Sequence, residues 1–327
     1  MTDTPKLGRR AALLATPSLL LAARTAQAQA GEWPNRPVRV IVPWPPGGTA
    51  DVVTRLLFAA AAEATGQPFV IENRAGATGT IGAAAAAQAA PDGYTVLYGS
   101  TGLSVEAALF KNLSYSAQRD FVPVFRSITV PQLLLVNPKV KATTPAELIA
   151  LSKATPGAER GLGRHRLDPA LALELFARES GAPVNHVPYR GGAPIYADLM
   201  SGQVDLYLGN VNGPIAFLKE GTLRALAHTG RGRLASLPDL PPLSDTLPGF
   251  ETYEWNGVFV PKGTPEPIVT RLNALLNAAQ AKPDIAAKLR AQELQTEPNT
   301  PQQFAEFFQA QSRRWQGFVK EAGITLE

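Results

Sequence analysis

Short apolar runs alternate with longer stretches of helical spacing from residue 31 onward. The run Val38 to Val42 is uniformly apolar, as expected for a strand that is covered on both faces. A turn rich in proline and glycine follows, and then a helix from about Asp51 to Ala64. Its apolar stripe is expected at Val52, Leu56, Ala59 and Ala60. Two further strands, Phe69 to Glu72 and Tyr94 to Tyr98, are also separated by a helical stretch, which predicts a parallel sheet with right-handed crossovers and an α/β fold.

A second series of elements follows in the middle of the chain. Strands are expected at 133–136, 185–188, 205–208, 223–227 and 255–260, and helices at 145–153, 169–180, 195–200, 267–279, 284–292 and 301–322. Two such series in one chain predict two lobes, with two strands crossing between them and a cleft beside the hinge. We expect lobe 1 to comprise residues 31–132 plus 254–327 and lobe 2 to comprise residues 133–253.

The first 30 residues have the layout of a secretory signal. Lys6 and the pair Arg9 and Arg10 precede an apolar stretch, and small residues end the segment at Ala30. The apolar stretch is shorter than a membrane span needs. We expect cleavage after Ala30 or Ala28 and a mature protein in the periplasm. The paired arginines favour the twin-arginine export route, and a Sec signal is the alternative.

Charge and composition exclude several classes of function. The chain has 31 basic and 27 acidic residues, and residues 1–30 hold four of the former and one of the latter. The mature chain therefore has 27 against 26, a net charge of +1, so the basic pI mostly reflects the signal and does not indicate nucleic acid as a partner. The absence of cysteine excludes disulfides, thiol catalysis, iron–sulfur clusters and cysteine-based zinc sites.

The turn after the first strand is a candidate anion site. Backbone N–H groups at a helix start lack intrahelical partners, and glycines let a ligand approach the backbone. Pro46 stiffens this turn, and the amides of Gly47, Gly48 and Thr49 are the candidate donors. Two alternatives stay open: Thr49 is simply the helix cap of an ordinary turn, and Asp51 is a capping residue instead of one that orients a ligand.

Two more glycine-bearing segments follow strands of the same sheet. One contains Gly79, and the other is a loop from Gly99 to Gly102 that includes Ser100 and Thr101. Neither has the spacing of a dinucleotide site or a P-loop, so nucleotide binding is not expected. Ligands of open α/β sheets lie beyond the carboxyl ends of the strands, where these segments should converge. Their convergence strengthens the prediction of an anion site.

The second lobe offers its own candidates. Tyr189, Arg190, Gly191 and Ala193 join a predicted strand to a helix, so that amides and one guanidinium are available for a second anionic group. Asp205 is either a sheet-edge residue or an acceptor in the site. Arg164 belongs to a basic cluster with Arg160, His165 and Arg166, which is either a solvated loop or a carboxylate-binding segment.

Enzyme signatures are mostly missing from the sequence. It contains no Gly-x-Ser-x-Gly, Ser-x-x-Lys or His-Glu-x-x-His motif. His165, His186 and His228 are far apart, and each is expected to be a surface or structural residue. A hydrolase that uses paired carboxylates stays open as an alternative, although nothing points to it.

Taken together, several motifs resemble those of one known family. They are VPWPPGGTADVVTR (42–55), IENRAGATGTIG (71–82), PDGYTVLYGS (91–100), DFVPV (120–124), VPYRGGAPIYADLMSGQVDLYLG (187–209), LRALAHTG (223–230), LPDLPPLSDTLPGFE (237–251) and GTPEPIVTRLN (263–273). In this order they resemble the substrate-binding receptors of tripartite tricarboxylate transporters, the Bug family. The match spans nearly the whole mature chain.

The resemblance implies a two-lobed, Venus-flytrap periplasmic binding protein of type II-like architecture, with mainly parallel sheets and helices on both faces. It would bind a small organic carboxylate through backbone amides and deliver it to membrane transporter subunits, as a monomer without catalysis, cofactor, metal or nucleic acid. A sensor for a membrane signalling partner is the alternative, and a periplasmic hydrolase a weaker one. Arg164 and Asp205 are candidates from the residue patterns alone. The ligand-binding residues that the resemblance implies are Trp44, Pro46, Gly47, Gly48, Thr49, Asp51, Thr78, Gly79, Thr80, Ser100, Thr101, Tyr189, Arg190, Gly191 and Ala193.

One segment departs from the family pattern. Residues 160–169 carry three arginines where the family usually has a small loop of serine and glycine followed by a histidine. Arginine suits bidentate recognition of carboxylates, which favours a more anionic ligand such as a di- or tricarboxylate. A pocket that has lost its ordinary function is the alternative.

Overall fold

The computed structural model describes residues 33–154, 162–165, 167–184, 186–189 and 192–324. Its first part forms the parallel arrangement expected from the sequence. β1 (Val38–Val42) lies between β2 (Phe69–Asn73) and β3 (Thr95–Ser100) and pairs with both in parallel. α2 (Thr49–Thr65) connects β1 to β2, and η1 (Ala77–Gly79) and α3 (Thr80–Ala87) connect β2 to β3. The carboxyl ends of these three strands therefore lie at one edge of the sheet.

α2 buries a different face from the one predicted. Val53, Leu57 and Phe58 are almost fully buried, whereas Val52 and Leu56 are half-buried and Ala59 is exposed. Of the predicted stripe, Ala60 is buried. Val52 and Val53 are both apolar, as are Leu56 and Leu57, so the sequence permits two offsets of the stripe. Phe58 fixes the observed one, because its ring packs against Phe69 of β2.

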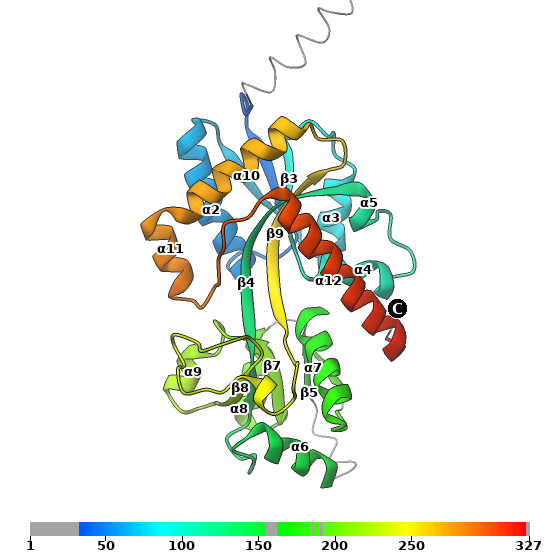
Figure 1. The fold of residues 1–327 in the computed structure, drawn as a ribbon, viewed down its shortest axis with the longest axis vertical. Coiled ribbons are helices and arrows are strands. Elements are labelled where there is room, and N and C mark those ends of the chain that lie inside the picture. The colour runs from blue at the N-terminus through cyan, green and yellow to red at the C-terminus, as the bar shows by residue number, and fades with distance from the viewer. Residues whose placement is uncertain (1–32, 155–161, 166, 185, 190–191, 325–327) are drawn as a thin grey trace, which may run out of the picture.

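Two long strands connect the upper and lower parts of the molecule (Figure 1). β4 (Phe121–Val136) and β9 (Tyr253–Pro261) pair antiparallel from Phe121 opposite Pro261 to Pro131 opposite Tyr253. β9 also pairs antiparallel with β3, so the crossing strands continue the upper sheet. The lower end of β4 pairs antiparallel with β7 (Leu206–Asn210) and β8 (Arg224–His228).

The seven strands of this sheet run in the order β2-β1-β3-β9-β4-β7, with β8 also paired to β4. A separate parallel pair, β5 (Leu162–His165) and β6 (His186–Tyr189), lies in the lower part. The α/β class is confirmed. The expectation of mainly parallel sheets holds for β1, β2, β3, β5 and β6 but not for the crossing strands, because a strand that returns between two lobes runs against its partner.

The remaining helices cover both parts. Those of the lower part are α6 (Pro145–Ala154), α7 (Leu167–Ser180), α8 (Gly192–Ser201) and α9 (Ile215–Lys219), followed by η2 (Leu243–Asp245). Those of the upper part are α4 (Gly102–Leu109), α5 (Ala117–Asp120), α10 (Glu266–Ala281) and α11 (Pro283–Arg290). α12 (Pro301–Ala322) starts in the upper part and descends toward α7 (Figure 1). Among the helices of the described ranges, none is long and apolar enough to cross a membrane.

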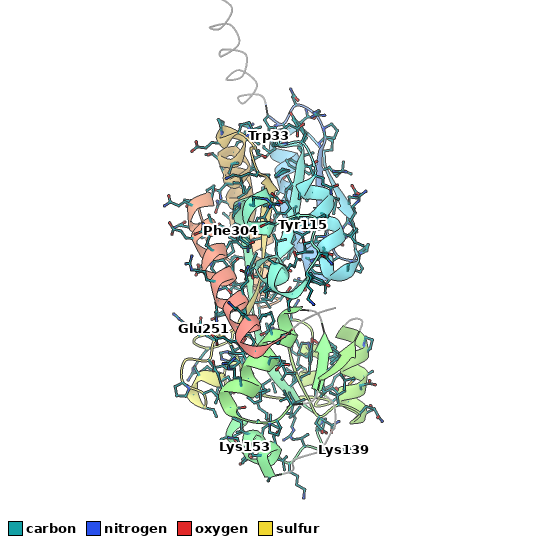
Figure 2. All side chains as sticks on the ribbon, turned by 90° about the vertical axis from the view of Figure 1, so that its right-hand side faces the viewer. Trp33, Tyr115, Lys139, Lys153, Glu251 and Phe304 are labelled. Carbon is teal, nitrogen blue, oxygen red and sulfur yellow. The ribbon has the colours of Figure 1, made fainter. Side chains whose placement is uncertain are left out.

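α12 packs into two different cores. Its first half buries Phe304 and Phe308 against Trp255 and Phe259 of β9. Its second half buries Trp315 and Val319 in a cluster that contains residues of α4 and α7. Figure 2 shows Phe304 in the upper part and Glu251 at the junction, beside the lower part of this helix. One helix thus contacts both parts of the molecule on the same side.

Candidate functional site

The first predicted loop ends in a helix start that is open to a ligand. Gly47 and Gly48 are exposed, and Gly48 is the N-cap of α2 in an extended conformation (φ −78°, ψ 167°). No side chain in the described part of the chain caps this helix. Thr49 is the first helical residue, so the interpretation of Thr49 as the cap is wrong. The first N–H groups of a helix have no intrahelical acceptor and carry the positive end of its dipole, which suits a carboxylate.

Asp51 holds this loop in place. Its side chain is almost fully buried; it accepts hydrogen bonds from the amide of Gly47 (3.0 Å) and from Asn73 Nδ2 (2.9 Å), and it pairs with Arg55 (2.9 Å). Burial alone would raise the pKa of this carboxyl group, but the hydrogen bonds from Arg55, Gly47 and Asn73 outweigh it and lower the pKa to about 2. This geometry favours bracing of the loop over the direct ligand contact expected for Asp51.

Asn73, which was not among the predicted site residues, connects the first loop to the end of β2. Its Nδ2 atom also donates to the carbonyl of Trp44 (3.0 Å), and its Oδ1 atom accepts from Arg55 (3.0 Å). The signal in the sequence is a polar amide at the last position of a strand that precedes a glycine-bearing turn.

The second loop lies under the ring of Trp44. A Cβ atom at Gly79 would lie 3.0 Å from Trp44 Cη2, so glycine allows the ring to rest on the backbone. Thr78 has a left-handed conformation (φ 58°), which is uncommon for a residue other than glycine, and the Thr80 hydroxyl donates to the carbonyl of Ala77 (2.8 Å). α3 starts directly after Gly79 and has no side-chain cap within the described residues. A second helix start therefore lies beside the first.

The third predicted loop is shorter than expected. Gly99 and Ser100 still belong to β3 and pair with β9, and α4 begins at Gly102. Thr101 is 1% exposed, and its hydroxyl accepts the amide of Trp255 (2.9 Å), so this side chain supports the crossing strand. The interpretation of residues 99–102 as an open loop is therefore wrong, because β9 continues the ladder to Ser100. A third helix start nevertheless follows the third parallel strand.

The lower part reaches the first helix start through Asn212. Its Nδ2 atom donates to the hydroxyl of Thr49 (2.8 Å), across 163 residues of sequence. Asn212 follows β7 directly, in the sequence Asn210-Val211-Asn212-Gly213. Asn212 was not among the predicted site residues; its signal in the sequence is a turn-forming Asn-Gly pair after an apolar strand.

Asp205 lies at the other end of β7. The register pairs Leu206 with Val136 and Asn210 with Gln132, and Gln132 is the nearer of the two to the upper part. Asp205 therefore precedes the far end of the strand, about 17 Å along it from Asn210 at roughly 3.4 Å per residue. The expectation that Asp205 contacts a ligand between the two parts is wrong, because the sequence does not tell which end of a strand faces the other lobe.

Several candidates of the second lobe are described only in their backbone. Arg164 lies on β5, Tyr189 ends β6 and Ala193 lies at the start of α8. Arg190 and Gly191, like Arg160 and Arg166, lie outside the described residues. The register places Arg164 opposite Pro188 and His165 opposite Tyr189. The segment expected as a basic loop is thus partly a strand, β5, which is followed by α7 and runs beside β6, the strand that precedes α8.

Metal-ligating groups and the buried histidine of the lower part were compared with this arrangement within the described residues. The described residues contain no group of three or more His, Asp or Glu side chains arranged to hold a metal ion. His228 lies on β8 with no exposed surface, and burial lowers its pKa. It is a residue of the lower core, as expected.

Three parallel strands that each lead, at one sheet edge, to a helix without a side-chain cap, with a second lobe reaching across, are the arrangement of an α/β solute-binding protein. The sequence of residues 53–324 matches the family model described as tripartite tricarboxylate transporter family receptor. The chain belongs to this family, as its motifs predicted.

Relatives and solved structures agree with this assignment. Protein BugT of Bordetella pertussis is 37% identical over 309 residues, which cover 92% of this chain and 94% of BugT. The structure of R. palustris Rpa4515 with adipate is 35% identical, has a TM-score of 0.81 and covers 90% of this chain and all of that one. MatC from Rhodopseudomonas palustris with bound malate is 32% identical with a TM-score of 0.77, over 88% of this chain and all of that one. The periplasmic binding protein BugD is 30% identical with a TM-score of 0.78, over 90% of this chain and all of that one.

Proposed function

We propose that this chain is a non-enzymatic periplasmic receptor that captures a small organic carboxylate between its two lobes and delivers it to the membrane subunits of a tripartite transporter. The observation that carries the proposal is the set of uncapped helix starts of α2, α3 and α4, which follow three neighbouring parallel strands. Backbone donors and aligned helix dipoles stabilise a carboxylate without a formal positive charge. Family membership and the adipate and malate complexes of relatives support this choice of ligand.

The contact residues follow from this arrangement. We propose that amides of Gly48 and Thr49, the segment Thr78 to Thr80 and the amide of Gly102 at the start of α4 bind one carboxylate. Ser100 and Thr101 are buried and support the start of α4 from the ladder with β9. Tyr189 to Ala193 and Arg164 would serve a second group from the lower lobe. Trp44 closes the site over the second loop, and Asp51 acts indirectly by bracing Gly47.

The organisation of the precursor is part of the same proposal. Residues 1–30 serve as an export signal that is removed after Ala30 or Ala28, and the mature receptor is a monomer. The lobes divide into residues 31–132 plus 254–327 and residues 133–253, with β4 and β9 as the connections.

A thermal-shift experiment on the ligand-stripped mature chain tests the proposal. Adipate, malate, citrate and benzoate are compared at increasing concentration. A bound ligand at a hundredfold excess over its Kd stabilises the folded state by about 2.7 kcal/mol, which raises the melting temperature by several degrees. We expect at least one carboxylate to do so.

Adipamide and malamide are the matched controls, because they keep the carbon chain and replace each carboxylate by a neutral amide. They should leave the melting temperature unchanged. If no carboxylate raises the melting temperature, or if an amide raises it as much as its parent acid, carboxylate recognition is wrong.

A further inference from the structure

The hydrogen bond between Asn212 and Thr49 joins the lower lobe to the first ligand loop. The donor is a half-buried side-chain amide, and the acceptor is the hydroxyl of the first residue of α2 (2.8 Å). Thr49 is adjacent to Gly48, whose amide we place among the ligand donors. A contact at this point is made only when the lobes are close together, so its presence depends on the angle between them.

Asn212 is held firmly on the lower lobe. The amide of Val211 donates to the carbonyl of Pro131 on β4 (3.0 Å), and the amide of Gly213 donates to the carbonyl of Asn210 (3.2 Å). Gly213 also lets the hydroxyl of Tyr196 approach the backbone, where a Cβ atom would clash with it. The turn 210–213 is therefore rigid, and it is attached directly to a crossing strand.

The other crossing strand is attached to the same turn. The side-chain amide of Asn210 donates to the carboxylate of Glu254 on β9. Since β4 and β9 together connect the lobes, a change of lobe angle moves the turn 210–213 with respect to Thr49.

The acceptor is equally well fixed on the upper lobe. Asp51 binds the amide of Gly47 and the guanidinium of Arg55, and Asn73 ties the loop to β2. A hydrogen bond between two rigid supports is sensitive to small changes in their separation, because its strength falls steeply with distance and angle.

We propose that Asn212 is an interlobe latch: its hydrogen bond to Thr49 stabilises the closed arrangement of the lobes and positions the start of α2 over the ligand. The latch rests on the proposed receptor function for its purpose, but it acts in the ligand-free protein as well. Asn212 is thus a positioning residue that sets the balance between open and closed forms, and with it the rate of ligand release. Loss of one such hydrogen bond should shift this balance roughly three- to tenfold toward the open form.

Distances between two spin labels, measured by double electron–electron resonance, test the latch in the ligand-free protein. The chain has no cysteine, so Ala59→Cys on α2 and Lys219→Cys on α9 introduce two spin labels at exposed positions of the two lobes without competing thiols. Asn212→Ala and Thr49→Val should both shift the distance distribution toward longer separations. Thr49→Ser, which keeps the hydroxyl, should retain the wild-type distribution.

Asn35→Ala is the matched control. Asn35 Oδ1 accepts a hydrogen bond from the Tyr94 hydroxyl (2.7 Å), and both residues belong to the upper lobe. Its removal should leave the distribution unchanged. Circular dichroism confirms that each variant is folded.

Two further outcomes complete the test. The double variant Asn212→Ala/Thr49→Val should be no more open than either single variant, because both remove the same bond. In stopped-flow measurements of adipate release, Asn212→Ala should raise the dissociation rate constant roughly three- to tenfold.

Superimposable distance distributions of wild type and Asn212→Ala would overturn the latch, and so would a Thr49→Ser variant as open as Thr49→Val. If adipate and the other carboxylates fail to bind but the distributions still shift, the receptor proposal is wrong while the latch stands.

Discussion

The two sides of the lobe junction are built from different interactions. On the side of the helix starts, the lower lobe contacts Thr49 through one polar hydrogen bond from Asn212. On the side of α12, Trp315 and Val319 are 3% and 1% exposed and pack in a cluster with Phe176 of α7. A single hydrogen bond contributes about 1 kcal/mol, whereas a buried tryptophan contributes several. One side of the junction can therefore open while the other stays packed and acts as the pivot.

Polar contacts on the α12 side do not change this comparison. Arg178 pairs with Glu321 at 3.3 Å, but both side chains are at least half exposed, so the pair contributes little. A cavity of about 600 Å³ lies beside this pair, and Trp315 and Phe318 line it. The apolar contacts, not the ion pair, hold this side together.

The largest expected effect is the loss of the packed side. Trp315→Ala should lower the free energy of unfolding by about 3–5 kcal/mol, because it leaves a cavity between α4, α7 and α12. Urea unfolding followed by circular dichroism measures the change. Phe318→Ala, at a half-buried position of the same helix, is the control and should cost clearly less. A loss below about 1 kcal/mol for Trp315→Ala would show that α12 is not the structural side of the junction.

A buried acid in the same region should make the packed side sensitive to pH. Glu106 of α4 is 4% exposed, and burial raises its pKa to about 7 although the Tyr115 hydroxyl donates to it. A raised carboxyl pKa favours the neutral form in the folded state. Its contribution is complete below the ordinary value of 4.5 and is lost as the pH rises toward 7.

Glu106→Gln removes this dependence. The variant should be as stable as the wild type near pH 4 and more stable by up to about 3 kcal/mol at pH 8. Unfolding curves between pH 4 and pH 8 measure the difference. Tyr115→Phe should raise the pKa of Glu106 further and lower the free energy of unfolding at neutral pH, because it removes the hydroxyl that donates to the charged carboxylate. Parallel pH curves for wild type and Glu106→Gln would contradict a buried neutral acid.

Much of the fold follows from local patterns in the sequence. The apolar run of β1 and the helical spacing of α12 predicted both elements with the observed bounds. Residues 121–132 of β4 were missed, because Pro123 and Pro131 interrupt the apolar pattern. Pro123 is tolerated because the ladder with β9 is irregular beside it. The buried face of α2 was likewise decided by a ring contact that the sequence does not reveal.

One part of the candidate site could be predicted from a single segment of sequence. The glycines before α2 predicted a turn at a helix start, and this turn is exposed and has no side-chain cap. Asp205 was placed wrongly and Asn212 was overlooked for one common reason: their positions depend on how β7 runs against β4. That orientation is a long-range property, which neither spacing nor composition encodes.

Asp51 provides the corresponding test on the side of the helix starts. Asp51→Asn removes the charge that binds Arg55 and the amide of Gly47, so the loop should loosen. The pKa of Asp51 is lowered to about 2, so its contribution is present above the ordinary value of 3.8 and is lost as the pH falls toward 2. The variant should lose about 2 kcal/mol of stability at pH 7.

The difference between wild type and Asp51→Asn should shrink as the pH falls from 4 to 2, which is the reverse of the behaviour at Glu106. Unfolding by urea at pH 7, 4 and 3 measures it. Asp284→Asn, an exposed change on α11, controls for general charge effects and should cost little. A constant difference over this pH range would mean that the carboxylate of Asp51 does not act through its charge.

The smallest effect on the folded state should come from Gly48→Val, although it is the most direct test of ligand contact. Gly48 has an ordinary φ of −78°, and a Cβ atom there would lie 4.0 Å from the nearest atom, the carbonyl oxygen of Pro45. The side chain therefore fits the protein and costs about 1 kcal/mol at most through the weaker N-cap. It lies on an exposed loop, where it should block the approach of a carboxylate to the amides and weaken binding at least about tenfold.

Calorimetry measures this change in affinity, with the carboxylate that stabilises the wild type most. Gly317→Val on α12 is the matched control, because it also has free space around it. Unchanged affinity in Gly48→Val would place the ligand away from the start of α2, and ligand binding would then not explain why this side of the junction opens.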